Sequence, residues 1–413
     1  KIRLSYGSLG NQQIGYYDFI QTITTKGSMS DYSFDGTVLG QHATVSDPVS
    51  GDQTWEKVVS KNLGLDLNMF NNRLSLTTDF YIRDTKGILG KGKSLPSIYG
   101  ASEPQMNANN LRTKGYELVL GWRDSFKLAG STFSYGITGT FSDYTAEYTK
   151  CDNPTGLIGD PYVGKKYGEI WGYKVDGLFR NDKEAAEYAS RIDLSTVASG
   201  YYTATGAYGK GVRGGDIKYL DLNGDNIVNG GKGTLDDPGD RRVIGNSSPR
   251  YQYGASLNFS WYGFDVSVFM QGIGRLDWYP GADNLRFWGP YCRPYATFVP
   301  KNFMSQVWSE ENPDAYFPRA RAYTSLNSNS GTAYYTNDRY LQNLAYCRLK
   351  NLTIGYTIPR RLTSKVGIKE CRIYFSGENL ATWSALKSDF LDPEQAAADS
   401  DKKANVYPWC KTY

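Results

Sequence analysis

The sequence predicts an all-β fold, and three observations carry this prediction: the composition, a two-residue periodicity of the side chains, and the lengths of the connections between periodic stretches. Aromatic residues make up 15% of the 413 residues, and 45 residues are glycine. Aromatic side chains favour strands because they pack well on a pleated surface, whereas glycine favours turns. The composition therefore indicates a strand-rich chain with many glycine-containing turns.

The second observation is an alternation of apolar and small polar side chains, which is clearest in residues 131–143. Phe133, Tyr135 and Ile137 share one face of an extended chain there, and small residues such as Thr138 share the other. A period of two is that of a strand with one apolar face. Such alternation predicts nine strands, near residues 1–9, 54–69, 73–84, 110–122, 131–143, 250–261, 264–272, 343–358 and 369–378.

The third observation is that short and long connections alternate between these strands. Residues 70–72 and 262–263 are two of the short connections. The long ones are residues 10–53, 85–109, 144–249, 273–342 and 379–413. A transmembrane barrel has this rhythm because its periplasmic turns are short and its extracellular loops are long. The sequence therefore predicts an antiparallel transmembrane β-barrel, of which these residues supply a part with long extracellular loops.

A large soluble β-sandwich or propeller is the alternative, because these folds also alternate apolar and polar residues. The polar face of the predicted strands carries small rather than charged side chains, as the lumen of a barrel does. Aromatic residues stand at strand ends, where interfacial girdles belong: Trp122, Tyr251 and Trp261. No repeat of about 20–50 residues, which would mark a propeller, is visible.

The inventory of reactive side chains disfavours several functions. The net charge is +4, with basic and acidic residues interspersed, so a nucleic-acid partner is not expected. His42 is the single histidine, and Ser-His, Cys-His and histidine-rich metal sites would all depend on it. We therefore predict that the chain is not an enzyme and assign no catalytic residue. Five cysteines without a C-x-x-C spacing indicate neither a zinc site nor a complete disulfide framework.

One segment, DLNGDNIVN at residues 221–229, places oxygen ligands at alternating positions as a calcium loop does. The candidate metal ligands are Asp221, Asn223, Asp225 and the backbone carbonyl of Ile227. The match is incomplete, because Lys232 occupies the position of the usual bidentate acid. The sequence predicts at most one divalent cation, Ca²⁺ or Mg²⁺, and no other cofactor. A loop held by Asx turns without an ion is the alternative.

Aromatic residues in the long connections form a second group of candidates. Such rings stack on sugars or peptide side chains, or they bury themselves where loops pack together. The candidate substrate-binding residues are Tyr162, Trp171, Trp278 and Trp288. Connections as long as 144–249 and 273–342 are generally functional, so capture of a ligand at the outer surface is expected.

Several stretches, taken in their order and spacing, resemble one family nearly end to end. They are SYGSLGNQQI (5–14), TWEK (54–57), NLGLD (62–66), NNRLSLTTDFY (71–81), KGYEL (114–118), IWGYKVDGLF (170–179), GDIKYLDLNGD (215–225), PGDRRVIGNSSPRY (238–251), RLKNLTIGYTIP (348–359) and FSGENL (375–380). On these residues the chain resembles the C-terminal part of the barrel of SusC/RagA-like TonB-dependent transporters, which lie in the outer membrane of Bacteroidetes.

The resemblance implies a barrel of about 22 strands that is closed by an N-terminal plug. It also implies a SusD-like surface lipoprotein as a lid, uptake of glycan oligosaccharides or peptides, and energy supplied through the TonB complex. The plug, the earlier strands and a last membrane strand are not found in these 413 residues, so they are expected in a longer polypeptide or a separate chain. The alternatives are a passive diffusion porin and a soluble carbohydrate-binding β-protein.

Overall fold

The computed structural model describes residues 1–11, 20–29, 39–51, 53–92, 97–203, 211–292, 299, 301–321, 326, 331–388, 391–398 and 409–413. Parts of all five predicted long loops, 10–53, 85–109, 144–249, 273–342 and 379–413, therefore lie outside the described residues. Within the described part of the chain, no helix is both long and apolar enough to cross a membrane.

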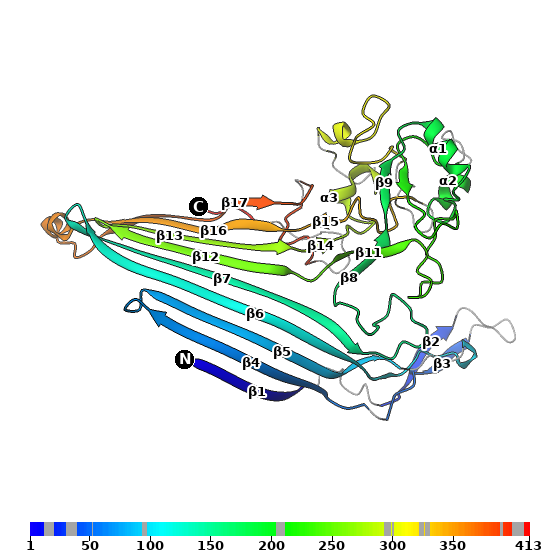
Figure 1. Ribbon diagram of the computed structural model, residues 1–413, viewed down its shortest axis with the longest axis horizontal. Helices are drawn as coiled ribbons and strands as arrows, with labels where there is room; N and C mark the ends of the chain where they lie inside the picture. Colours follow the sequence, from blue (N-terminus) through cyan, green and yellow to red (C-terminus); the bar gives the residue numbers. More distant parts are fainter. Residues whose placement is uncertain are drawn as a thin grey trace.

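A single antiparallel sheet of nine strands runs along the molecule (Figure 1). Its strands, in spatial order, are β1 (Ile2–Asn11), β4 (Glu56–Met69), β5 (Leu74–Lys91), β6 (Gln105–Leu128), β7 (Ser131–Lys150), β12 (Arg250–Trp261), β13 (Phe264–Arg275), β16 (Tyr346–Thr357) and β17 (Arg372–Ser384). Each sheet strand pairs with the next one along the chain, as in the wall of an up-and-down barrel. The predicted all-β class and the nine strands are confirmed.

The strand ends differ from the predicted ones. β5 continues to Lys91 and β6 begins at Gln105, so both strands extend into the stretch expected to be a loop at 85–109. β7 likewise continues to Lys150. These extensions contain residues such as Asn107 and Asn109, which show no apolar alternation. The backbone pairing continues in these extensions although neither face is apolar. Side-chain periodicity therefore cannot reveal that the strands continue.

The register separates the side chains onto two faces. Leu63, Phe80 and Tyr116 stand opposite one another on β4, β5 and β6, and the row beside them carries Asp79 and Glu117 on the other face. We call these the apolar face and the polar face. Large side chains stay exposed along the apolar face, namely Leu4, Leu63, Phe80, Leu120, Ile137, Phe259, Phe264, Ile354, Ile373 and Phe375. A soluble sandwich would cover such a face with a second sheet.

Aromatic rings border the apolar face at both ends. Towards the long connections, ring centroids of Phe80, Tyr116, Phe141 and Tyr251 follow one another at 6.3, 6.0 and 6.4 Å. Towards the short turns, the close ring pairs are Phe126–Phe133, Trp261–Tyr262 and Phe264–Tyr356. Trp261 and Tyr251 thus lie in opposite aromatic rows, as the sequence predicts for interfacial girdles.

The long connections fold into a compact unit at the end of the sheet opposite the short turns (Figure 1). We call the described residues of 151–249 and 276–344 the loop domain. Its strand pairs are β8 (Glu169–Tyr173) with β11 (Arg241–Asn246), β9 (Val175–Leu178) with β10 (Ile217–Tyr219), and β14 (Asp277–Trp278) with β15 (Gln342–Asn343). Its helices are α1 (Asp182–Ala189), α2 (Ser199–Thr203) and α3 (Leu285–Trp288), with 3-10 turns at Gly289–Tyr291 and Phe303–Gln306.

The remaining elements are small. β2 (Ile23–Met29) and β3 (Leu39–Val45) form a hairpin at the same end as the loop domain (Figure 1). α4 (Arg360–Thr363) and a 3-10 turn at Ser364–Val366 join β16 to β17, and a further 3-10 turn spans Ser97–Tyr99. The buried apolar core of the described residues lies in the loop domain, together with Leu391 and Ala396 from the segment after β17, rather than against the sheet.

Candidate functional site

A buried ion pair joins the two long connections inside the loop domain. Arg321 Nε lies 2.9 Å from Asp216 Oδ1, and the two side chains are 4% and 1% exposed. The guanidinium also lies over the ring of Tyr201, 4.1 Å from its centroid. Burial raises the pKa of Asp216 above its ordinary value, although the charge of Arg321 opposes the shift. The pair therefore holds the two connections together at a point closed to water.

The core around this pair is aromatic and includes two of the predicted substrate-binding residues. Trp278 is 5% exposed and Trp288 is fully buried. The ring of Trp288 packs against Phe287 and Tyr340 at centroid distances of 4.8 and 5.1 Å. Any further polypeptide that packs against the loop domain would lower the exposed fractions of Trp278 and Trp288 and could not raise them. In this arrangement both tryptophans are packing residues, and neither presents its ring to a ligand, because both rings are buried in the core of the loop domain.

The other two predicted residues lie nearer the surface of the loop domain. Tyr162 and Trp171 are both partly exposed. The Tyr162 hydroxyl donates a hydrogen bond to Glu169 at 2.8 Å, and the Lys165 ammonium lies 5.3 Å from the Tyr162 ring centroid. Burial and the bond to Glu169 raise the pKa of Tyr162 to about 12. A ring with a fixed hydroxyl, a cation and a carboxylate beside it can contact either a sugar or a peptide.

The loop at 221–229 is held by its own backbone amides. Asp221 accepts hydrogen bonds from the N–H groups of Gly224 and Asn226 at 2.7 and 2.9 Å. Asp225 accepts from the N–H of Ile227 at 2.8 Å. Asn226 has a φ of 64°, the left-handed conformation usually given to glycine at this position.

These side chains are the ones that would supply a cation with oxygen ligands, together with Asn223, whose side chain accepts from the N–H of Asp225 at 3.0 Å. Among the described residues, no three His, Cys, Asp or Glu side chains come together as a potential metal site. The Asx-turn alternative accounts for these contacts, and cation binding stays a prediction.

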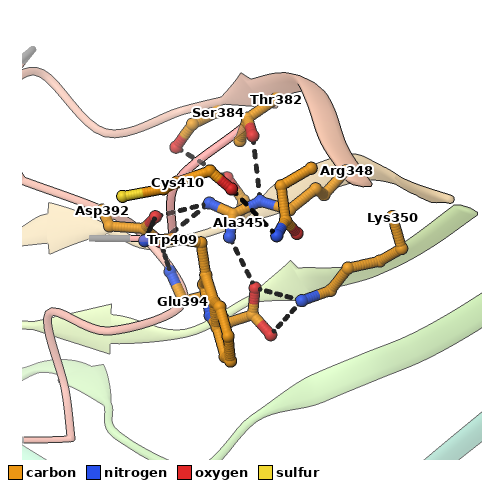
Figure 2. A network of polar contacts seen from close by, with 10 residues as sticks. Ala345, Arg348, Lys350, Thr382, Ser384, Asp392, Glu394, Trp409 and Cys410 are labelled. Carbon is orange, nitrogen blue, oxygen red and sulfur yellow. Dashed lines mark hydrogen bonds and ion pairs between the residues drawn. The ribbon is translucent and has the colours of Figure 1, made fainter. Parts of the chain in front are cut away.

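A charged network on the polar face ties the segment after β17 to the strand β16 (Figure 2). Arg348 Nη2 lies 2.8 and 2.7 Å from the two carboxylate oxygens of Asp392, and Nη1 lies 2.8 Å from Glu394. Lys350 binds the same Glu394 at 2.8 Å and lies 4.7 Å from the ring centroid of Trp409. The network holds residues 391–398 against the polar face of β16.

Fixed charges also line the polar face away from this network. Arg3 Nε lies 2.9 Å from Asp66, and Arg3 Nη2 lies 2.8 Å from Asp79, which also accepts from Asn62. Together with the hydroxyl and amide side chains of the same face, these groups make a wettable surface.

Sequence reasoning did not identify Arg348, Asp392 or the Asp216–Arg321 pair. The partners of each pair are separated by 44 and 105 residues, so no local spacing could have connected them. The one available signal was an Asp-Pro-Glu sequence at 392–394, within the predicted long connection 379–413.

Comparison with known proteins gives one group of relatives. No protein-family model matches the chain. The TonB-dependent receptor P3 of Formosa agariphila is 25% identical over 421 aligned residues, which cover 98% of this chain and 37% of the relative. The TonB-dependent receptor SusC of Bacteroides thetaiotaomicron is 21% identical over 425 aligned residues, covering 100% of this chain and 36% of the relative. The chain thus spans little more than a third of the length of these relatives.

Solved structures give the same result for the fold. The RagAB peptide transporter superposes with a TM-score of 0.64 at 22% identity, over 95% of this chain and 38% of the other. The RagAB peptide importer in its open-open state superposes with a TM-score of 0.63 at 21% identity, over 95% and 37%. The predicted resemblance to SusC/RagA-like TonB-dependent transporters and the partial antiparallel barrel are therefore confirmed. These relatives are receptors and transporters rather than enzymes, as the sequence predicts.

Proposed function

We propose that this SusC/RagA-like chain forms one part of the wall and a large share of the outer surface of an outer-membrane nutrient importer in a Bacteroidetes-like Gram-negative bacterium. The observation that carries the proposal is the apolar face with an aromatic row at each end. Apolar surface of this extent is stable only when it is removed from water. A lipid bilayer between two interfaces matches an aliphatic band between two aromatic rows.

The polar face is the lumen in this proposal. Its ion pairs, such as Arg3 with Asp79, are wettable groups that hydrated oligosaccharides or peptides can pass. The two outer strands of the sheet, β1 and β17, need further partners, because an unpaired backbone N–H or C=O in lipid costs several kcal/mol. We infer that additional strands and a plug close the barrel and that this closure involves polypeptide other than these 413 residues.

The loop domain is the docking surface for a SusD-like lipoprotein and the upper wall of the substrate chamber. Its aromatic core and its buried Asp216–Arg321 pair support this role, because a rigid surface loses little conformational entropy when a partner binds. RagAB, which shares the fold, is described as a peptide transporter. For this chain the proposed substrates are glycan oligosaccharides or peptides, with the partly exposed Tyr162 and Trp171 as contacts and TonB as the source of energy.

Uptake by cells that carry the complete protein tests the proposal. We expect the protein in the outer-membrane fraction, co-purification of a surface lipoprotein, and uptake of labelled oligosaccharides or peptides that stops when a protonophore collapses the proton gradient. Uptake that continues without the gradient would indicate a passive porin instead. Recovery of the protein in solution without detergent would indicate a soluble β-protein.

A further inference from the structure

A hollow of about 700 Å³ lies on the sheet at the end of the apolar face nearest the loop domain. Its floor on the apolar face is made by Leu63, Phe80 and Ile82, which are 48%, 54% and 40% exposed, together with Leu4 and Tyr116. These side chains come from four neighbouring strands. The hollow is therefore part of the wall itself and does not depend on a loop.

Two lysines stand at the edge of this floor. Lys61 on β4 is directly opposite Ile82 on β5, and Ile82 is directly opposite Lys114 on β6. The three side chains form one row on the same face. Their outer members are two strand spacings, or about 10 Å, apart at the backbone. Both lysines line the hollow.

Three carboxylates lie near these lysines on the same face; two of them are bound to arginines, and the third, Glu147, stands directly opposite Arg112 and does not line the hollow. Asp143 is held by Arg250 through two contacts of 2.6 Å, and Asp84 is held by Arg112 through contacts of 2.7 and 3.2 Å. Within the described part of the chain, neither Lys61 nor Lys114 forms an ion pair. The edge of the hollow therefore keeps a positive charge that its own acids do not neutralise.

The same face carries more positive charge further from the apolar band. Lys57 lies directly opposite Lys86 on the neighbouring strand. Like charges in a directly opposed cross-strand pair are destabilising unless an anion lies between or beside them. The row of lysines and the apolar floor are therefore complementary to one kind of ligand, which is apolar at one end and anionic at the other.

We propose that this hollow binds a membrane lipid with an anionic, phosphate-bearing headgroup. The acyl chain lies on Leu63, Phe80 and Ile82, and the phosphate lies between Lys61 and Lys114. A free phosphate would leave the floor uncovered, and a lipid without net charge would leave the lysines unneutralised. The inference rests on the proposed function, because it needs the apolar face to lie in a bilayer.

Native mass spectrometry of the complete protein in detergent tests this site. The probes are phosphatidic acid and phosphatidylcholine with the same acyl chains, and inorganic phosphate alone. We expect one phosphatidic acid to bind roughly tenfold more tightly than phosphatidylcholine, since each basic residue at an anionic interface adds a modest attraction. The K61E/K114E variant should lose this preference.

The K127E/K365E variant is the matched control, because it reverses two lysines that do not line the hollow, one near the end of β6 and one in the 3-10 turn after α4. It should keep the preference for phosphatidic acid. Equal binding of the two lipids, an unchanged preference in K61E/K114E, or binding of inorganic phosphate as tight as that of phosphatidic acid would each overturn the inference. Outer-membrane fractionation and uptake of K61E/K114E report separately on the proposed function, which stands if both are normal.

Discussion

Arg348 and Asp392 face each other across a closed contact in which one guanidinium nitrogen lies 2.8 and 2.7 Å from the two carboxylate oxygens. The side chains are 3% and 7% exposed. Glu394 adds a second carboxylate at 2.8 Å, so the segment after β17 is fixed to β16 by the strongest kind of hydrogen bond available to side chains (Figure 2).

Removal of Arg348 should release this segment. Arg348→Ala leaves Asp392 without its cationic partner and Glu394 with Lys350 alone, and the loss of one member of a buried pair costs about 3–5 kcal/mol. We expect faster amide hydrogen exchange in residues 391–398. Arg372→Ala, which breaks the more exposed pair with Asp265, is the control and should leave that segment unchanged. Unchanged exchange in Arg348→Ala would show that the segment is held by other contacts.

The Asp216–Arg321 pair should control the opening of the loop domain. Arg321→Ala leaves Asp216 buried without its partner, at a cost of about 3–5 kcal/mol. Cys292 is buried in the same core, so its labelling by a thiol reagent, followed by peptide mass spectrometry, reports opening. We expect faster labelling in Arg321→Ala and a partial return towards the original rate in D216N/R321Q. Lys183→Ala, on the exposed side of α1, should have no effect. If Cys292 is labelled as fast in D216N/R321Q as in Arg321→Ala, the ion pair does not control the opening of the loop domain.

The two classes of predicted tryptophan should behave differently. Trp288→Ala removes a fully buried ring, which typically costs about 3–5 kcal/mol, and should therefore accelerate the labelling of Cys292. Trp171→Ala removes a partly exposed ring and should lower substrate uptake while the labelling rate stays normal. If Trp171→Ala leaves uptake of both oligosaccharides and peptides intact, Trp171 is not a substrate contact.

The start of α1 should loosen in acid. The Glu184 carboxylate is partly buried, which raises its pKa, but hydrogen bonds from the Arg180 N–H at 2.8 Å and from Lys218 at 3.1 Å outweigh burial and leave the pKa below its usual value. A lowered pKa contributes stability that is present above the usual value of about 4.3 and is lost as the pH falls through the lowered value.

Amide exchange in residues 182–189, corrected for the intrinsic effect of pH, measures this loss. We expect protection to fall between about pH 5 and pH 3. In Glu184→Gln the protection should be low at both pH values, because the neutral amide no longer pairs with Lys218. A fall of the same size in Glu184→Gln would assign the pH dependence to another group.

The loop at 221–229 tests the predicted cation. If one divalent ion is bound, elemental analysis should find about one Ca²⁺ or Mg²⁺ per chain, and a chelator should speed exchange in this loop. The D221A/D225A variant should lose the ion. Equal ion content in the variant and the original protein would leave the Asx turns as the only support of the loop.

The sequence predicted the sheet more completely than the loops. The alternation around Phe133 and Ile137 located β7, because the side chains of a strand report its two environments residue by residue. The extension of β7 to Lys150 was missed, because both faces are polar or mixed beyond the apolar band. The folded state of the connections was missed as well, since their strands are short and their helices carry no long apolar period.

What the sequence determined by itself is the identity of the strands, the separation of the two faces and the family resemblance, because each depends on residues close together in the chain or on their order. The tertiary structure decided which aromatic rings are buried and which charges meet. Trp171 and Trp288 are equivalent candidates in the sequence, yet only Trp288 is fully buried, where its ring packs against Tyr340. Arg348 and Asp392 are separated in sequence by β17 and meet only in the folded chain. Burial and ion pairing of this kind depend on contacts between distant residues.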